Sequence, residues 1–89
     1  MEKALILGKL SHRVPRNIIE QFKKIKGVSD ADMVFGPYDF YIVIKTDSKE
    51  MLGDTSLKIR SIKGVLDSQT CYVVSLPEIR PEAKGPFVT

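Results

Sequence analysis

The chain has 89 residues, of which 43% are hydrophobic and 28% charged, a composition typical of one small folded domain and not of a disordered polymer. Its net charge of +3 and pI near 9.1 permit weak attraction to nucleic acid without favouring it. No apolar stretch reaches the length of a membrane span, and a single cysteine cannot form an internal disulfide, so we expect a cytoplasmic protein.

Six elements are predicted in the order strand, helix, strand, strand, helix, strand. Apolar runs predict strands over residues 4–10, 28–35, 39–45 and 70–76. A Gly-Pro pair punctuates the chain between the second and third strands. This order predicts two consecutive βαβ units.

Both helices are predicted from apolar residues at helical spacing. The first has one apolar face, made of Val14, Ile18, Phe22 and Ile25. Pro15 suits its first turn, because a proline there loses no helical hydrogen bond. The second begins after Asp47 or Ser48 as N-cap, and its apolar face is made of Leu52, Ile59 and Ile62.

The tetrapeptide I-K-G-V occurs twice, at residues 25–28 and 62–65. In both copies it follows a helical pattern and precedes an apolar run. Gly27 and Gly64 therefore fall at helix ends, where a left-handed backbone favours glycine. The repeat predicts a pseudo-symmetric α+β fold of the ferredoxin-like βαββαβ type, a four-stranded antiparallel sheet with two helices on one face.

The predicted sheet has too many apolar residues for one face to meet water. In the third strand Phe40, Ile42 and Ile44 point one way, while Tyr41 and Val43 point the other. Two helices cover only one face, and large exposed apolar patches are rare on monomers. We therefore expect a homodimer of the dimeric α/β-barrel type, in which a second copy covers the other face.

The alternative cover is the chain's own C-terminal extension. Residues 77–89 contain three prolines, which prevent a regular helix or a central strand. We divide the chain into a ligand-binding and oligomerisation domain at residues 1–76 and this extension at 77–89.

Few residues suit catalysis or metal binding. One histidine, His12, and one cysteine, Cys71, cannot assemble a zinc site, and Cys71 is expected to be buried in an apolar strand. Asp30 and Asp32 share one face of a predicted strand, but no partner for acid–base chemistry is identified. We expect no enzymatic activity, no metal and no cofactor.

The segments KKIKGVSDADMVFGPYDFYIVIKTDS and LKIRSIKGVLDSQTCYVVSL resemble the effector-binding (RAM) domain of the Lrp/AsnC family of transcription regulators. The shared marks are two I-x-G-V segments with G-x-Y-D between them. The resemblance covers residues 3–76. It implies dimers that associate into octamers or similar assemblies, with small amino-acid effectors bound at the interfaces between dimers.

The resemblance also implies a ligand-binding site. Gly36, Tyr38 and Asp39 match the G-x-Y-D turn, while Ser68 and Thr70 match the family's T-x-T pattern, with Ser68 in place of the usual threonine. Asp39 would accept hydrogen bonds from an α-ammonium group, and the two hydroxyls would hold an α-carboxylate.

The chain departs from the family pattern in lacking the N-terminal helix-turn-helix domain. The resemblance therefore implies a stand-alone amino-acid-sensing domain without specific DNA binding of its own, which modulates full-length Lrp/AsnC relatives. Three alternatives remain: a structural partner of such a regulator without its own ligand, a small dimeric α+β barrel enzyme using His12 and Arg13, and an ACT-type regulatory domain.

Overall fold

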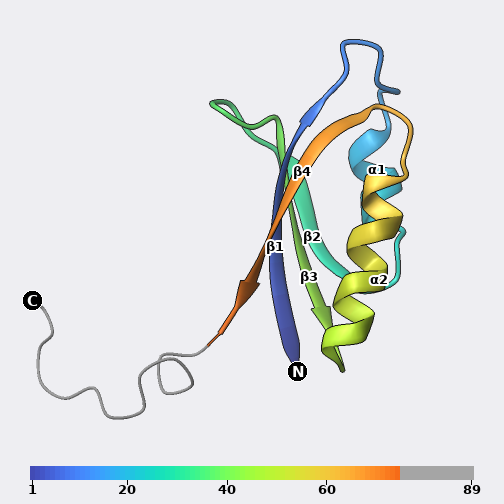
Figure 1. The fold of residues 1–89 in the computed structure, drawn as a ribbon. Coiled ribbons are helices and arrows are strands. Elements are labelled where there is room, and N and C mark those ends of the chain that lie inside the picture. The colour runs from blue at the N-terminus through green and yellow to red at the C-terminus, as the bar shows by residue number, and fades with distance from the viewer. Residues whose placement is uncertain (75–89) are drawn as a thin grey trace, which may run out of the picture.

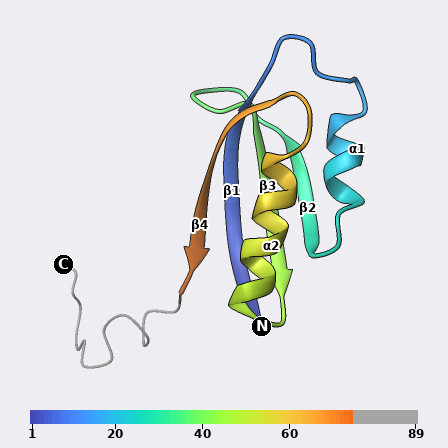
Figure 2. The same cartoon turned by 45° about the vertical axis from the view of Figure 1, so that its right-hand side comes forward.

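The computed structural model describes residues 1–74, and the chain forms six elements in the predicted order (Figure 1). The strands are β1 (Glu2–Leu10), β2 (Val28–Met33), β3 (Phe40–Thr46) and β4 (Val65–Val73), and the helices are α1 (Ile18–Lys23) and α2 (Lys49–Arg60). The strands form one antiparallel sheet in the order β2-β3-β1-β4. Both helices lie on the same side of it (Figures 1 and 2). The predicted ferredoxin-like fold is confirmed.

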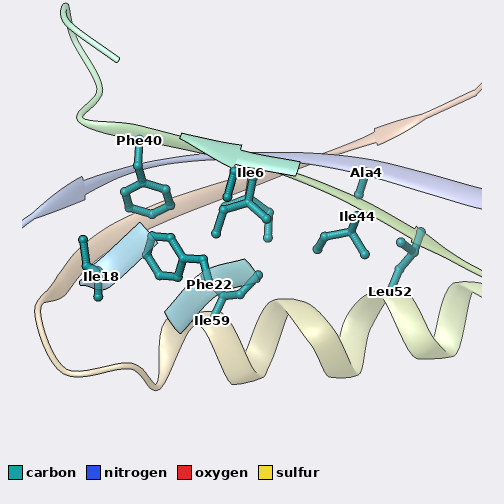
Figure 3. Packing of buried hydrophobic residues seen from close by; sticks show 10 residues of the cluster. Ala4, Ile6, Ile18, Phe22, Phe40, Ile44, Leu52 and Ile59 are labelled. Carbon is teal, nitrogen blue, oxygen red and sulfur yellow. The ribbon is translucent and has the colours of Figure 1, made fainter. Parts of the chain in front are cut away.

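The core lies between the sheet and the helices, and strand register decides which residues reach it. Residues directly opposite each other in an antiparallel pair project to the same face. Ala4, Ile6 and Gly8 of β1 lie opposite Ile44, Ile42 and Phe40 of β3, and all six are buried. Figure 3 shows Phe22 of α1 against Phe40, with ring centroids 4.9 Å apart.

The repeated I-K-G-V segments form the same turn in both halves. Gly27 and Gly64 have φ angles of 99° and 106°, as predicted for helix ends. The Val28 amide donates to the Ile25 carbonyl, and the Val65 amide to the Ile62 carbonyl, each at 3.1 Å. Each glycine carbonyl then accepts a hydrogen bond from elsewhere in the chain, from Lys45 at 2.8 Å for Gly27 and from Ser11 at 2.7 Å for Gly64.

Several element boundaries differ from the prediction, those of the first helix and the last strand most clearly. The first helix begins at Ile18, because the Ile18 amide bonds to the Pro15 carbonyl in a turn that precedes the helix. The last strand begins at Val65, several residues before the predicted start. The second helix is N-capped by Ser48 rather than Asp47, since the Ser48 hydroxyl accepts from the Met51 amide at 3.2 Å.

The prediction that Cys71 is buried is wrong. Cys71 is exposed, because its register partner in β1 is Leu5, which projects away from the helices. Residue 76, the predicted end of this strand, and the extension at 77–89 lie outside the described residues.

The side of the sheet opposite the helices is apolar at its centre, and we call it the open face. Leu5 and Leu7 of β1 and Tyr41 and Val43 of β3 are only partly buried there. No described helix or strand lies over this side (Figures 1 and 2).

Neither described helix is long and apolar enough to cross a bilayer.

Candidate functional site

The β2–β3 connection, which carries the predicted G-x-Y-D turn, is anchored to the sheet through Asp39. The Asp39 amide donates to the Gly8 carbonyl at 2.7 Å, and the Asp39 carbonyl accepts from the Val34 amide at 3.0 Å. The Asp39 carboxylate accepts through Oδ2 from the Leu10 amide at 2.9 Å. Asp39 thus fixes the base of the connection, and one of its carboxylate oxygens is engaged by the fold.

The side chains from the end of β2 into the same connection make little contact with their own chain, and we call residues 33–36 the hairpin tip. Phe35 is fully exposed (107%), Met33 is 51% exposed and Val34 is 38% exposed. Gly36 has a φ of 154°, which L side chains rarely adopt, and no atom lies within 4 Å of where its Cβ would be. The space that this glycine leaves open is therefore not filled by its own subunit.

Tyr38 links this connection to the far edge of the sheet. Its hydroxyl donates to the side-chain carbonyl oxygen of Gln69 in β4 at 3.1 Å. Gln69 lies opposite Leu7 and so projects to the open face. The turn thus reaches over β1 to contact β4.

Ser68 and Thr70 project to the other side of β4, toward α2. They lie opposite Gly8 and Ile6 of β1, which face the helices. The Thr70 hydroxyl donates to the hydroxyl of Ser56 in α2 at 3.4 Å. Both residues line a groove of about 340 Å³ between α2 and β4, whose other lining residues are Gly53, Ser56, Leu57, Arg60 and Tyr72. We call this the α2–β4 groove.

The five predicted site residues therefore form two clusters. Ser68 and Thr70 lie together in the α2–β4 groove. Gly36, Tyr38 and Asp39 do not line it and belong to the β2–β3 connection. Gln69 lies between Ser68 and Thr70 in sequence but faces the opposite way, so the clusters contact opposite faces of β4.

Sequence reasoning missed the other lining residues of the groove, among them Ser56 and Arg60. A signal for them was present: residues 53, 56, 57 and 60 are spaced i, i+3, i+4 and i+7, so they share one helical face next to the apolar face. Arg60 and Ser68 also line an adjoining hollow of about 120 Å³. Together with Ser68, Thr70 and Tyr72, Ser56 and Arg60 give the groove one cation and four hydroxyls.

The carboxylates of β2 are engaged locally. The Tyr41 hydroxyl donates to Asp30 Oδ2 at 2.9 Å, while Asp30 Oδ1 accepts from the Ala31 amide. Asp32 accepts from the adjacent Met33 amide at 2.8 Å. The hydrogen bond to Asp30 is the main cause that raises the pKa of Tyr41 above its ordinary value of 10.0.

The two residues that an enzymatic alternative would use lie away from the groove. His12 and Arg13 are exposed between β1 and α1, and neither lines the α2–β4 groove or the hollow that adjoins it. Among residues 1–74, no three His, Cys, Asp or Glu side chains are grouped so that they could hold a metal ion.

Solved structures with the same fold include FFRP-DM1, with 25% identity and a TM-score of 0.75 over 83% of this chain and 100% of that one. The hypothetical protein PHS023 from Pyrococcus horikoshii has 25% identity and a TM-score of 0.75 over 84% of this chain and 92% of that one. The leucine response regulatory protein LrpA of Mycobacterium tuberculosis has 17% identity and a TM-score of 0.69 over 83% of this chain and 51% of that one. No family model matches the sequence, and no curated protein matches it significantly.

These structures confirm the resemblance inferred from the sequence: the chain has the fold of solved structures that include the Lrp/AsnC-type regulator LrpA. It spans the full length of FFRP-DM1 and about half the length of LrpA. One of these structures is described as a regulatory protein and another as a hypothetical protein.

Proposed function

We propose that the chain is an amino-acid-sensing, self-assembling domain that binds a small amino-acid effector where subunits meet and modulates full-length Lrp/AsnC regulators. The observation that carries this proposal is the β2–β3 connection. Its base is fixed by Asp39, yet its tip projects from the sheet with Phe35 fully exposed and open space at Gly36. A turn whose base is fixed and whose tip makes little contact with its own subunit is suited to contact a neighbouring subunit and a ligand held between them.

The open face supports assembly into a dimer first. Leu5, Leu7, Tyr41 and Val43 form a half-exposed apolar centre with Val73 at its edge. Burying apolar surface stabilises association by roughly 25 cal/mol per Å². A second copy packed on this face would remove most of that surface from water and leave the hairpin tips free for contacts between dimers.

A ligand at such an interface binds the assembled state in preference to the free subunit, so binding and assembly are linked. This linkage gives the test. The solution mass is measured by light scattering with and without a mixture of amino acids at millimolar concentration, and thermal unfolding is followed in the same samples. We expect a homo-oligomer whose mass or melting temperature changes with the amino acids. A monomer at micromolar concentration would refute the assembly, and an oligomer that responds to no amino acid would refute sensing and leave a structural partner of a regulator.

A further inference from the structure

The α2–β4 groove lies within one subunit and is built from two regular elements. One face of α2 supplies Gly53, Ser56, Leu57 and Arg60. The inward side of β4 supplies Ser68, Thr70 and Tyr72, at alternate positions of the strand. At about 340 Å³ the groove is at the lower end of the range for small-molecule sites, so it suits a ligand of few atoms.

One part of the groove is suited to an oxyanion. Arg60 lies in the last turn of α2 and lines both the groove and the adjoining hollow, which it shares with Ser68 and with Asp67, a residue that does not line the groove itself. The hydroxyls of Ser56 and Thr70 are joined only by a long hydrogen bond of 3.4 Å. A carboxylate would accept shorter, charge-assisted hydrogen bonds from these hydroxyls and from the guanidinium, whose planar donors match its two oxygens.

The groove also offers apolar surface. Leu57 and Tyr72 are 58% and 55% exposed, large values for residues of this type, and they line it from α2 and from β4. A short apolar body beside the carboxylate would cover both side chains. At Gly53 no atom lies within 4 Å of the Cβ position, so the helix backbone leaves room there.

We propose that the α2–β4 groove binds a small organic acid with a short apolar body, whose carboxylate is held by Arg60 and by the hydroxyls of Ser56, Ser68 and Thr70. The groove proposal deepens the proposed function. It rests on that function for the expectation that the ligand is an effector. It differs from a site between subunits because one subunit supplies the whole carboxylate site. It also does not require the α-ammonium group of an amino acid.

The test uses three probes with the same apolar body: L-leucine, its 2-oxo acid 4-methyl-2-oxopentanoate, which lacks the ammonium group, and leucinamide, which lacks the carboxylate. Binding to the full chain is measured by titration calorimetry. The variant is Arg60→Gln. The matched control is Lys58→Gln, which removes a cation from the same last turn of α2 but from a residue that does not line the groove.

We expect leucine and the 2-oxo acid to bind the unmodified chain, and leucinamide to bind at least about tenfold more weakly. Arg60→Gln should weaken both carboxylate probes about tenfold or more, whereas Lys58→Gln should leave them within about twofold. Failure of the 2-oxo acid to bind, or unchanged binding to Arg60→Gln, would overturn the groove proposal.

This experiment distinguishes failure of the groove proposal from failure of the proposed function. Binding of the 2-oxo acid that is lost in Arg60→Gln, without binding of leucine and without a response to the amino-acid mixture in the light-scattering test, supports the groove and refutes amino-acid sensing. Binding of leucine that is unchanged in Arg60→Gln refutes the groove and leaves the proposed function in place. No binding of any probe refutes the groove.

Discussion

The carboxylate of Asp39 accepts a hydrogen bond from the backbone amide of Leu10, 29 residues away in the chain, at 2.9 Å. Together with the bond from the Asp39 amide to Gly8, it ties the β2–β3 connection to the end of β1. The residue that the family resemblance assigns to an effector is therefore also part of the fold. Substitutions at Asp39 therefore have to distinguish effector binding from anchoring of the β2–β3 connection.

Asp39→Ala removes the acceptor of a partly buried amide, so we expect the free energy of unfolding to fall by about 1–3 kcal/mol in urea denaturation. Asp39→Asn keeps a side-chain carbonyl for Leu10 and should cost less. Because Asn removes the charge, it should still weaken any response to amino acids. Asp32→Ala is the control, since its carboxylate is exposed and bonds only to the next residue. Equal stability of Asp39→Ala and the unmodified chain would contradict the anchoring role.

Gly8→Ala and Gly53→Ala are expected to change stability in opposite directions. A Cβ at Gly8 would collide with the fully buried ring of Phe40 and lie 2.5 Å from the Asp67 carbonyl oxygen, so we expect a loss of roughly 1–3 kcal/mol or more. At Gly53 the Cβ meets no atom within 4 Å, and alanine in place of glycine within a helix should add about 0.5–1 kcal/mol. Urea denaturation of both variants measures the difference. A Gly8→Ala chain as stable as the unmodified one would show that β1 and its neighbours are not packed as described.

The Tyr41–Asp30 hydrogen bond predicts a dependence on alkaline pH. Because the pKa of Tyr41 is raised in the fold, the folded state holds its proton more tightly than the unfolded state. The resulting stabilisation is fully present below pH 10.0 and is lost as the pH rises through the folded-state pKa. The phenolate absorbance of the unmodified chain minus that of Tyr41→Phe gives the titration of Tyr41 alone. In Asp30→Asn we expect the pKa of Tyr41 to fall back toward 10.0, and an unchanged titration would show that Asp30 is not its cause.

Leu7→Lys tests the open face as the dimer interface. A lysine at the centre of this face would bring an unpaired charge into a buried interface, so we expect the chain to become monomeric while remaining folded, because Leu7 does not face the helices. Light scattering gives the mass and circular dichroism the fold. Leu57→Lys, on the exposed side of α2, is the control and should leave the dimer intact. A Leu7→Lys chain with unchanged mass would place the interface elsewhere.

Phe35→Ser tests the hairpin tip as a contact between dimers. Because Phe35 makes so little contact with its own chain, its replacement should leave the melting temperature of the subunit nearly unchanged. We expect assemblies larger than dimers to dissociate to dimers in light scattering. Retention of the larger assembly would exclude the tip from that interface.

The sequence was sufficient to predict the element order and the helix ends because these depend on local rules. Gly27 and Gly64 adopt the left-handed backbone that their place after a helix predicted. The start of β4 was missed because Asp67, Ser68 and Gln69 interrupt its apolar pattern. β4 is an edge strand, in which polar residues lower stability little. Its length is therefore set by pairing with Lys3–Leu10 of β1 and not by its composition.

The candidate site was predictable only in part. Ser68 and Thr70 were assigned through the T-x-T pattern of the family resemblance. Arg60 lies in the groove because α2 packs against β4, a tertiary relationship that helical spacing alone does not state. The same reason explains Cys71. Its apolar neighbours predicted burial, whereas the register with Leu5 placed it on the side that no described helix covers.

The order β2-β3-β1-β4 interlocks the two repeated halves of the chain. β1 lies between β3 and β4, and β3 lies between β2 and β1, so neither half has two adjacent strands of its own. The peptide joining the halves at residues 34–39 is the single covalent link between them. A protease cut there would leave two fragments that each supply the other's missing neighbours, and two intact copies can exchange whole halves by the same complementation.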